Sequence, residues 1–299
     1  MPITKGLVGL HGGGHADTFG AALLDVAQDH LLALLDQLEL FDGGELTFKG
    51  GTSLRKCRLG GAGRFSTDLD FVAPSDDTVL EVCDAINGAR IGGFEFSLAM
   101  TRGDGRHWNL RVVHAELGQP DIPSSVEFAR RALVLPPERL DFVPLKIHRH
   151  YDVELPALPV ISEAEACAEK LARYRRVALG RDVYDLARFA ERQIDERVVR
   201  RLWVLKTWGD VVDDNRGSKP LHPEDLLAPR KAEDFVPESV GKLTQPVDIA
   251  DWERRVRARF GFLGELDEHE QRWAACDPRD RWEIEQALAS GGFPEAAGY

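Results

Sequence analysis

The stretch that decides the fold is Phe48-Lys49-Gly50-Gly51-Thr52-Ser53-Leu54-Arg55-Lys56, followed after a glycine-rich loop by Arg64-Phe65-Ser66-Thr67-Asp68-Leu69-Asp70-Phe71. The end of the second segment alternates apolar and polar residues, which is typical of a strand with one buried face. Because successive side chains of a strand point to opposite faces, Asp68 and Asp70 should share one face, while Leu69 and Phe71 point into the core. Two neighbouring carboxylates repel each other unless a cation lies between them. The pair therefore predicts a site for Mg²⁺, which prefers oxygen ligands and keeps phosphate oxygens in its shell.

The glycine pair upstream has a matching role. Gly50 and Gly51 would let the backbone pass close to a phosphate, and the N–H groups that begin the next helix would face that anion. The hydroxyls of Thr52 and Ser53 can add hydrogen bonds. A Walker A loop is excluded, because no Gly-x4-Gly-Lys-[Ser/Thr] is present. Taken singly, a glycine pair is often only a turn and an Asp-x-Asp pair is often only solvated; their combination favours a nucleotide site.

A third segment joins two predicted helices, Glu169-Lys170-Leu171-Ala172-Arg173 and Gly180-Arg181-Asp182-Val183-Tyr184-Asp185. Lys170 and Arg173 lie one turn apart, and Asp182 and Asp185 share a face of the following helix. A carboxylate in the first helical turn is favoured by the helix dipole. The pattern fits either a helix cap with an ion pair or a charged group that contacts a substrate.

Composition limits the possible functions. The chain has 299 residues, 43% of them hydrophobic, and a net charge of −12, which argues against unspecific coating of nucleic acid. Residues 170–201 nevertheless hold ten Lys or Arg against five Asp or Glu, a local basic segment that could face phosphates or form ion pairs. The four cysteines are widely spaced, so we expect reduced, packed thiols. Without a secretory signal or a run of about 20 apolar residues, the sequence predicts a cytoplasmic protein and no membrane partner.

Hydrophobic periodicity divides the chain into two parts. A helix is expected over 16–40 and another over 77–87, with extended segments near 46–48, 65–72, 94–100, 108–115 and 125–128. Helical spacing dominates later, over 162–178, 182–192, 195–213 and 250–288. We therefore predict a catalytic domain at 1–155 and a helical domain at 156–299 that completes the active site.

These three motifs together resemble the AbiEii/AbiGii-type toxin nucleotidyltransferases, which include the MenT toxins. The resemblance covers roughly residues 45–190. It implies an α+β fold like that of DNA polymerase β, with a mixed sheet followed by a mostly helical C-terminal half. It also implies the toxin of a type IV toxin–antitoxin system, with a cognate antitoxin as partner. The implied substrates are an NTP with Mg²⁺, or alternatively Mn²⁺, and the 3′ end of tRNA, whose modification blocks translation.

The resemblance also implies roles for particular residues. Its catalytic residues fall on Asp68, Asp70, Lys170 and Asp185. Its nucleotide-binding positions fall on Gly51, Thr52, Ser53, Lys56, Arg64, Ser66 and Asp182. Asp68 and Asp70 would be metal ligands, and this fold usually has a third carboxylate on a neighbouring strand. Glu127 is the candidate, because Val126 and Phe128 would face the core; a plain surface glutamate remains the alternative.

Other interpretations stay open. The same site could modify a protein or a small molecule, or the fold could bind an NTP without turnover. The run Arg173, Arg175, Arg176, Arg181 and Arg188 could offer a platform for RNA phosphates. His148 and His150 are two apart, which is not helical ligand spacing, so we expect no zinc site there.

Overall fold

Two strands carry the segments that flank the glycine pair. The computed structural model describes residues 3–177, 179–217, 221–235 and 240–292. In it, β1 (Thr47–Lys49) pairs antiparallel with β2 (Leu69–Val72), which pairs parallel with β6 (Ser125–Ala129). This register brings Phe48, Phe71 and Phe128 into one row, with ring centroids 5.5 and 5.8 Å apart. All three side chains are buried, so the apolar half of the alternation forms the core, as predicted.

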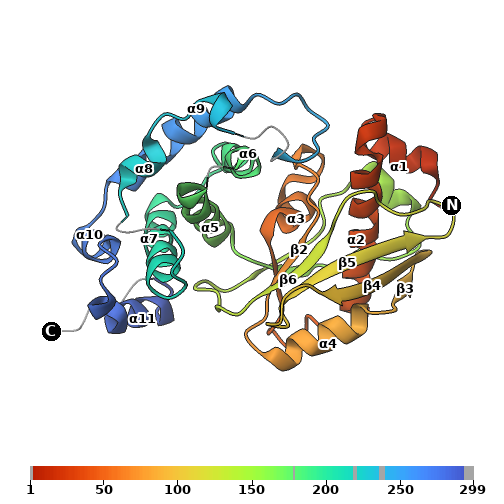
Figure 1. Cartoon of the computed structure of the whole chain (residues 1–299), viewed down its shortest axis with the longest axis horizontal. Helices are drawn as coiled ribbons and strands as arrows, with labels where there is room; N and C mark the ends of the chain where they lie inside the picture. Colours follow the sequence, from red (N-terminus) through yellow and green to blue (C-terminus); the bar gives the residue numbers. More distant parts are fainter. Residues whose placement is uncertain (1–2, 178, 218–220, 236–239, 293–299) are drawn as a thin grey trace. The chain divides into compact units, whose positions relative to one another are not determined.

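The sheet is mixed, which confirms the predicted fold class (Figure 1). Among the described residues it has eight strands in the order β3-β4-β5-β6-β2-β1-β8-β7. The pairs β2/β6 and β1/β8 are parallel and the others antiparallel. The remaining strands are β3 (Arg90–Ile91), β4 (Phe94–Met100), β5 (His107–His114), β7 (Glu138–Leu140) and β8 (Leu158–Val160).

Helix α2 (Phe19–Gln37) is the core helix of this first part. The segment Ala16–Gln37 is long and apolar enough to cross a membrane, but 83% of an apolar 18-residue stretch within it is buried inside the structure, as in a core helix. The other helices here are α1 (Lys5–His11), α3 (Gly50–Leu54) and α4 (Asp76–Ile86). A π-helical turn, η2 (Arg55–Leu59), continues α3 directly. It carries the chain from the glycine pair toward the acidic strand.

The second part is helical among the described residues. Its helices are α5 (Glu163–Arg176), α6 (Gly180–Phe189), α7 (Glu196–Val212), α8 (Pro223–Leu227), α9 (Ile249–Arg259), α10 (Glu268–Ala274) and α11 (Arg281–Ala289). Residue 178, the end of the helix expected over 162–178, lies outside the described residues. The prediction of a single helix over 250–288 was wrong, because the chain forms α9, α10 and α11 there. Asp267 caps α10 with a capping box, and Pro278 begins a separate turn before α11.

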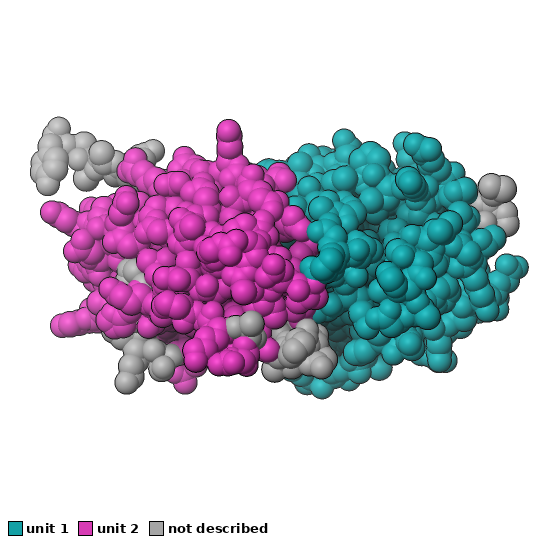
Figure 2. All heavy atoms as spheres, turned by 90° about the horizontal axis from the view of Figure 1, so that it is seen from above, with its two compact units in different colours: residues 1–132, 137–161, 241–246 teal, residues 133–136, 162–240, 247–299 magenta. Residues whose placement is uncertain are grey.

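The chain forms two compact units (Figure 2). Unit 1 comprises residues 1–132, 137–161 and 241–246, and unit 2 comprises 133–136, 162–240 and 247–299. The main division therefore falls between Ile161 and Ser162, a few residues after the boundary expected from the sequence. Ser162 begins the helical part, because its side chain caps α5 by accepting from the N–H of Glu165.

Candidate functional site

A polar row crosses one face of the unit 1 sheet. Lys49, Asp70, Glu127 and His107 are register neighbours on β1, β2, β6 and β5. Side chains at paired positions leave a sheet on the same face, so the four polar groups lie opposite the phenylalanine row. Asp70 and Glu127 are half-buried. The sequence prediction that Glu127 projects from the face opposite Val126 and Phe128 matches this register.

Asp68 belongs to the same group, although it lies one residue before β2. The hydroxyl of Ser125 is 2.9 Å from Asp68 Oδ1 and 3.3 Å from Glu127 Oε1. Since Ser125 and Glu127 are two apart on β6, they share a face. One hydroxyl thus links two of the acidic side chains, and the carboxylates of Asp68, Asp70 and Glu127 gather on one surface instead of diverging.

The glycine pair lies directly against these acids. Gly50 has φ of +80°, and a Cβ placed there would be 2.0 Å from Asp70 Oδ2. A Cβ on Gly51 would be 2.3 Å from Arg64 Nη2 and 2.9 Å from Ser66 Oγ. Only glycine fits at either position without displacing these neighbours. The backbone of α3 therefore meets the Arg64–Asp70 segment at van der Waals distance.

The two hydroxyls after the glycines are turned inward. Thr52 Oγ1 donates to the carbonyl of Asp68, and Ser53 Oγ donates to the carbonyl of Gly50 at 3.0 Å. Both side chains are completely buried. Thr52 therefore holds α3 against the segment that leads into the acidic strand, and Ser53 closes the first turn of α3. We call Gly50–Ser53 together with Arg64–Asp68 the cradle.

Lys56 lies elsewhere than the motif suggested. Its Nζ is 2.6 Å from Asp29 Oδ1 and 2.9 Å from Asp25 Oδ1, and the side chain is buried. Burial alone would lower the pKa of Lys56, but Asp25 and Asp29 outweigh burial and raise it. In place of the nucleotide contact expected from the motif, the amine has two buried carboxylate partners on α2.

In unit 2, the third motif forms its own buried cluster. Lys170 Nζ on α5 is 2.7 Å from Asp185 Oδ2 and 3.4 Å from Asp182 Oδ1 on α6. Arg173 Nε is 2.8 Å from Asp182 Oδ2. Asp182 and Asp185 are at most 2% exposed, and Lys170 is 8% exposed. The spacing argument is confirmed: residues one turn apart on each helix meet across the α5–α6 contact.

The basic run is largely neutralised by carboxylates. Arg173 pairs with Asp182, Arg175 with Asp225 at 3.7 Å, Arg176 with Asp210 at 3.1 Å and Arg188 with Glu191 at 3.2 Å. Arg175 is also buried, with a side chain only 5% exposed. These carboxylates offset the charge of four of the five arginines in the run, and the suggested platform for RNA phosphates stays a prediction.

Comparison with known proteins decides the family. The model of the family described as "Nucleotidyl transferase AbiEii toxin, Type IV TA system" matches residues 33–290. This chain belongs to that family. The structure of MenT4, a nucleotidyltransferase toxin from Mycobacterium tuberculosis H37Rv, is 66% identical to it, with a TM-score of 0.94, and the match covers 96% of this chain and 98% of that one. The resemblance inferred from the three motifs is thus confirmed.

More distant comparisons add little. JHP933 from Helicobacter pylori is 14% identical over 79% of this chain and 92% of that one, and its TM-score is only 0.41. No curated protein matches the sequence. The family assignment makes the chain a MenT-type nucleotidyltransferase toxin of a type IV system, which implies an NTP substrate and an antitoxin partner.

The acidic surface of this toxin fits a magnesium ion. Among the described residues, no three His, Cys, Asp or Glu side chains converge closely enough to enclose a metal by themselves. Mg²⁺ is usually held by one or two carboxylates, and takes its other ligands from substrate phosphates and water. The half-buried Asp68 and Asp70, beside backbone that only glycine can form, are a donor set of this kind.

Sequence reasoning missed several residues around the site of this nucleotidyltransferase. Ser125 could have been found, because Ser125-x-Glu127 repeats the alternation of Asp68-x-Asp70 on the neighbouring strand. Asp25 and Asp29 also carried a signal: two carboxylates four apart inside an otherwise apolar helix require buried partners. His107 had none, since its place beside Glu127 depends on the β5–β6 register.

Proposed function

We propose that this AbiEii-family toxin transfers a nucleoside monophosphate from an NTP to the 3′ end of a tRNA, with Mg²⁺ or Mn²⁺ as the metal, and so blocks translation. A tRNA acceptor would place the reaction in the cytoplasm. The observation that carries the proposal is the gathering of Asp68 and Asp70 on one face of the sheet, where Asp70 lies against Gly50.

The proposed reaction is an in-line displacement at phosphorus. The 3′-hydroxyl oxygen of the RNA attacks the α-phosphorus of the NTP. A new P–O bond forms as the bond from the α-phosphorus to the bridging oxygen breaks, the hydroxyl loses its proton, and pyrophosphate leaves. Bound Mg²⁺ would supply charge neutralisation for the triphosphate.

The residues of unit 1 are assigned as follows. Asp68 and Asp70 hold the metal, and Glu127, the register neighbour of Asp70, adds negative charge on the same face. Arg64 and Ser66 bind phosphate oxygens next to Gly51, where their polar atoms already approach the backbone. This assignment is supported by the burial of both side chains at the glycine turn, because a guanidinium held there is well placed to pair with a phosphate.

In unit 2, we assign Lys170 to the nucleotide and Asp185 as an essential acidic residue of the same reaction. Asp182 supports them: it pairs with both Lys170 and Arg173 and thereby orients the amine. We propose that unit 2 in this way completes the activity that unit 1 begins.

The test is a labelling experiment with the full chain. Total tRNA is incubated with Mg²⁺ and each radiolabelled NTP in turn, using wild type and Asp68→Ala. We expect labelled tRNA with wild type, and a loss of at least ~100-fold with Asp68→Ala, because a metal ligand is removed. Asp77→Asn is the matched control, since Asp77 is an exposed aspartate of the same unit at the start of α4.

Other products would point to other functions. Labelled protein or a labelled small molecule would replace the RNA acceptor. Nucleotide binding measured by calorimetry with no pyrophosphate release would make the chain a binding module. If no NTP labels any RNA, the proposal fails.

A further inference from the structure

Helix α2 carries three buried polar side chains on one face. Asp25, Gln28 and Asp29 have the spacing i, i+3, i+4 and are at most 1% exposed. The rest of the buried helix is mostly apolar. Buried charges and amides cost stability unless they are partnered, and apolar residues of similar size often serve stability as well or better. The partners of these three side chains therefore indicate what they do.

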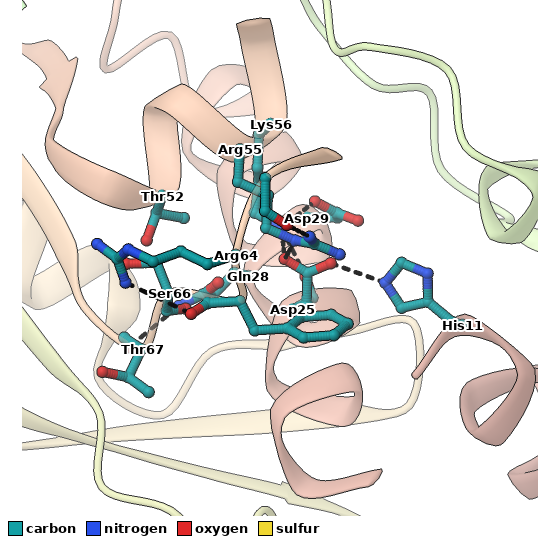
Figure 3. A network of polar contacts seen from close by, with 12 residues as sticks. His11, Asp25, Gln28, Asp29, Thr52, Arg55, Lys56, Arg64, Ser66 and Thr67 are labelled. Atoms are coloured by element: carbon teal, nitrogen blue, oxygen red, sulfur yellow. Dashed lines mark hydrogen bonds and ion pairs between the residues drawn. The ribbon is translucent and has the colours of Figure 1, made fainter. Parts of the chain in front are cut away.

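The two aspartates hold the far end of the cradle helix (Figure 3). Asp25 Oδ1 is 2.9 Å from both Arg55 Nε and Lys56 Nζ, and Asp29 Oδ1 is 2.6 Å from Lys56 Nζ. Arg55 and Lys56 begin η2, which continues directly from α3. A second bond, from Tyr151 to Asp29 at 2.6 Å, fixes that carboxylate from the other side. The position of α3 is thus tied to α2.

The same helix holds the other half of the cradle. Gln28 Nε2 donates to the carbonyls of Ser66 at 3.3 Å and Thr67 at 3.1 Å. Arg55 donates to the carbonyl of Gly63, and its guanidinium lies 3.9 Å above the ring of Phe65. The segment that carries Arg64, Ser66 and Asp68 is therefore tied to the same face of α2 as the glycine turn.

The hydrogen bonds of Gln28 indicate what this face of α2 does. Its amide nitrogen makes two hydrogen bonds, but its amide oxygen is buried without a hydrogen-bond donor among the described residues. A lone buried carbonyl costs free energy that an apolar side chain would avoid. The two bonds of its amide nitrogen nevertheless hold the 64–68 segment, which carries the residues proposed to bind phosphate.

We propose that Asp25, Gln28 and Asp29, acting through Arg55 and Lys56, are positioning residues that set the spacing between the glycine turn and the Arg64–Asp70 segment. This inference rests on the proposed function, because it assigns the cradle to the nucleotide. Charge supports it. Burial would raise the pKa of Asp25, but Arg55, Lys56 and His11 outweigh burial and hold it well below its ordinary value. The carboxylate is thus ionised against its cationic partners.

The first test variant is Gln28→Met, which keeps the size of the side chain and removes both donors. We expect a lower melting temperature, because the carbonyls of Ser66 and Thr67 lose their donor. In the protein that is folded, we expect the Kd for NTP with Mg²⁺ to rise and kcat/KM to fall about 10- to 100-fold, since small misplacements in a site cost this much. Unchanged Kd and kcat/KM in a folded Gln28→Met would overturn the proposal.

The second variant is Asp25→Asn, compared with Glu270→Gln in unit 2. Glu270 is also fully buried, with Arg200 at 2.7 Å and Arg201 at 3.0 Å. Both changes neutralise a buried carboxylate held by two cations, so both should destabilise the fold. Only Asp25→Asn should weaken NTP binding. If both variants raised the Kd for NTP equally, Asp25 would contribute to stability alone and the positioning proposal would be wrong.

Binding and turnover separate the two proposals. If wild type binds NTP but labels no RNA, the transfer proposal fails, and the Kd values of Gln28→Met and Asp25→Asn still decide the positioning role. If wild type binds no NTP, both proposals fall.

Discussion

Gly50 is the most constrained residue of the cradle. Its φ of +80° lies in the left-handed region, and its Cα faces the carboxylate of Asp70 so closely that an added Cβ would be 2.0 Å from Oδ2. The two constraints have different consequences. The backbone conformation costs folding free energy for any other residue, whereas the contact would displace a proposed metal ligand.

We predict that Gly50→Ala lowers nucleotide transfer at least ~100-fold and lowers the free energy of unfolding by ~1–3 kcal/mol. Gly44→Ala is the control for the backbone term alone, because Gly44 has φ of +71° with no atom within 4 Å of an added Cβ. Urea titrations and tRNA labelling of both variants measure the two effects. Equal activity in Gly50→Ala and Gly44→Ala would contradict a role for the Gly50–Asp70 contact.

Local pattern was enough to predict the acidic face, but not the partners of every motif residue. Strand alternation placed Asp70 correctly, because the period of a strand is fixed by its backbone. Asp68 precedes β2 and reaches the same face through its hydrogen bond with Ser125. Lys56 stands in the same motif, yet its partners Asp25 and Asp29 lie 31 and 27 positions earlier and meet it only in the folded chain. A motif gives residue types; long-range packing decides whether a side chain faces substrate or core.

At the scale of elements, α2 and η2 are joined by charges whose contribution depends on pH. Burial would raise the pKa of Asp25, yet its cationic partners lower it well below 3.8, and the pKa of Lys56 is raised above 10.5. An acid whose pKa is lowered by folding contributes stability at pH values above its unfolded pKa, and this stability is lost as pH falls through its folded pKa. A lysine whose pKa is raised by folding contributes stability below its unfolded pKa, and this stability is lost as pH rises through its folded pKa.

We therefore predict that the stability gap between wild type and Asp25→Asn is constant from about pH 5 to pH 9 and narrows below about pH 4. Urea unfolding at a series of pH values measures the gap. Asp36 on the same helix should show the opposite pH dependence of stability, because burial raises its pKa despite Arg139. Wild type should therefore gain stability relative to Asp36→Asn as pH falls. A gap for Asp25 that widens in acid would contradict the ion-pair account.

Helices were easier to predict than their ends or the order of the sheet. The expected segments 182–192 and 195–213 correspond to α6 and α7, since their apolar periodicity is local. The segment 250–288 kept helical spacing throughout, but the cap at Asp267 and the turn at Pro278 divide it. Nothing local predicts that β6 pairs with β2, because those strands lie more than 50 residues apart.

For the whole molecule, charge restricts how an RNA can bind. The chain has a net charge of −12, and four of the five arginines in the basic run are paired with carboxylates. Affinity for RNA that comes from phosphate contacts falls steeply with salt, with a slope of about −0.7 to −0.9 per neutralised phosphate. An acceptor held mainly at its 3′ end, by few phosphate contacts, should show a shallow slope.

We predict that KM for tRNA rises less than about 100-fold between 50 and 200 mM KCl, which corresponds to roughly four or fewer phosphates. Asp210→Asn should make the plot of log KM against log salt concentration steeper by up to about one, because it removes the carboxylate that lies 3.1 Å from Arg176, a residue of the basic run. Asp280→Asn is the matched control, since it removes an equally distant partner of Arg272, outside that run. Initial rates at several KCl concentrations give the slopes. A 1,000-fold loss for wild type, or equal slopes for the two variants, would mean that RNA is bound by a basic surface other than the one these pairs neutralise.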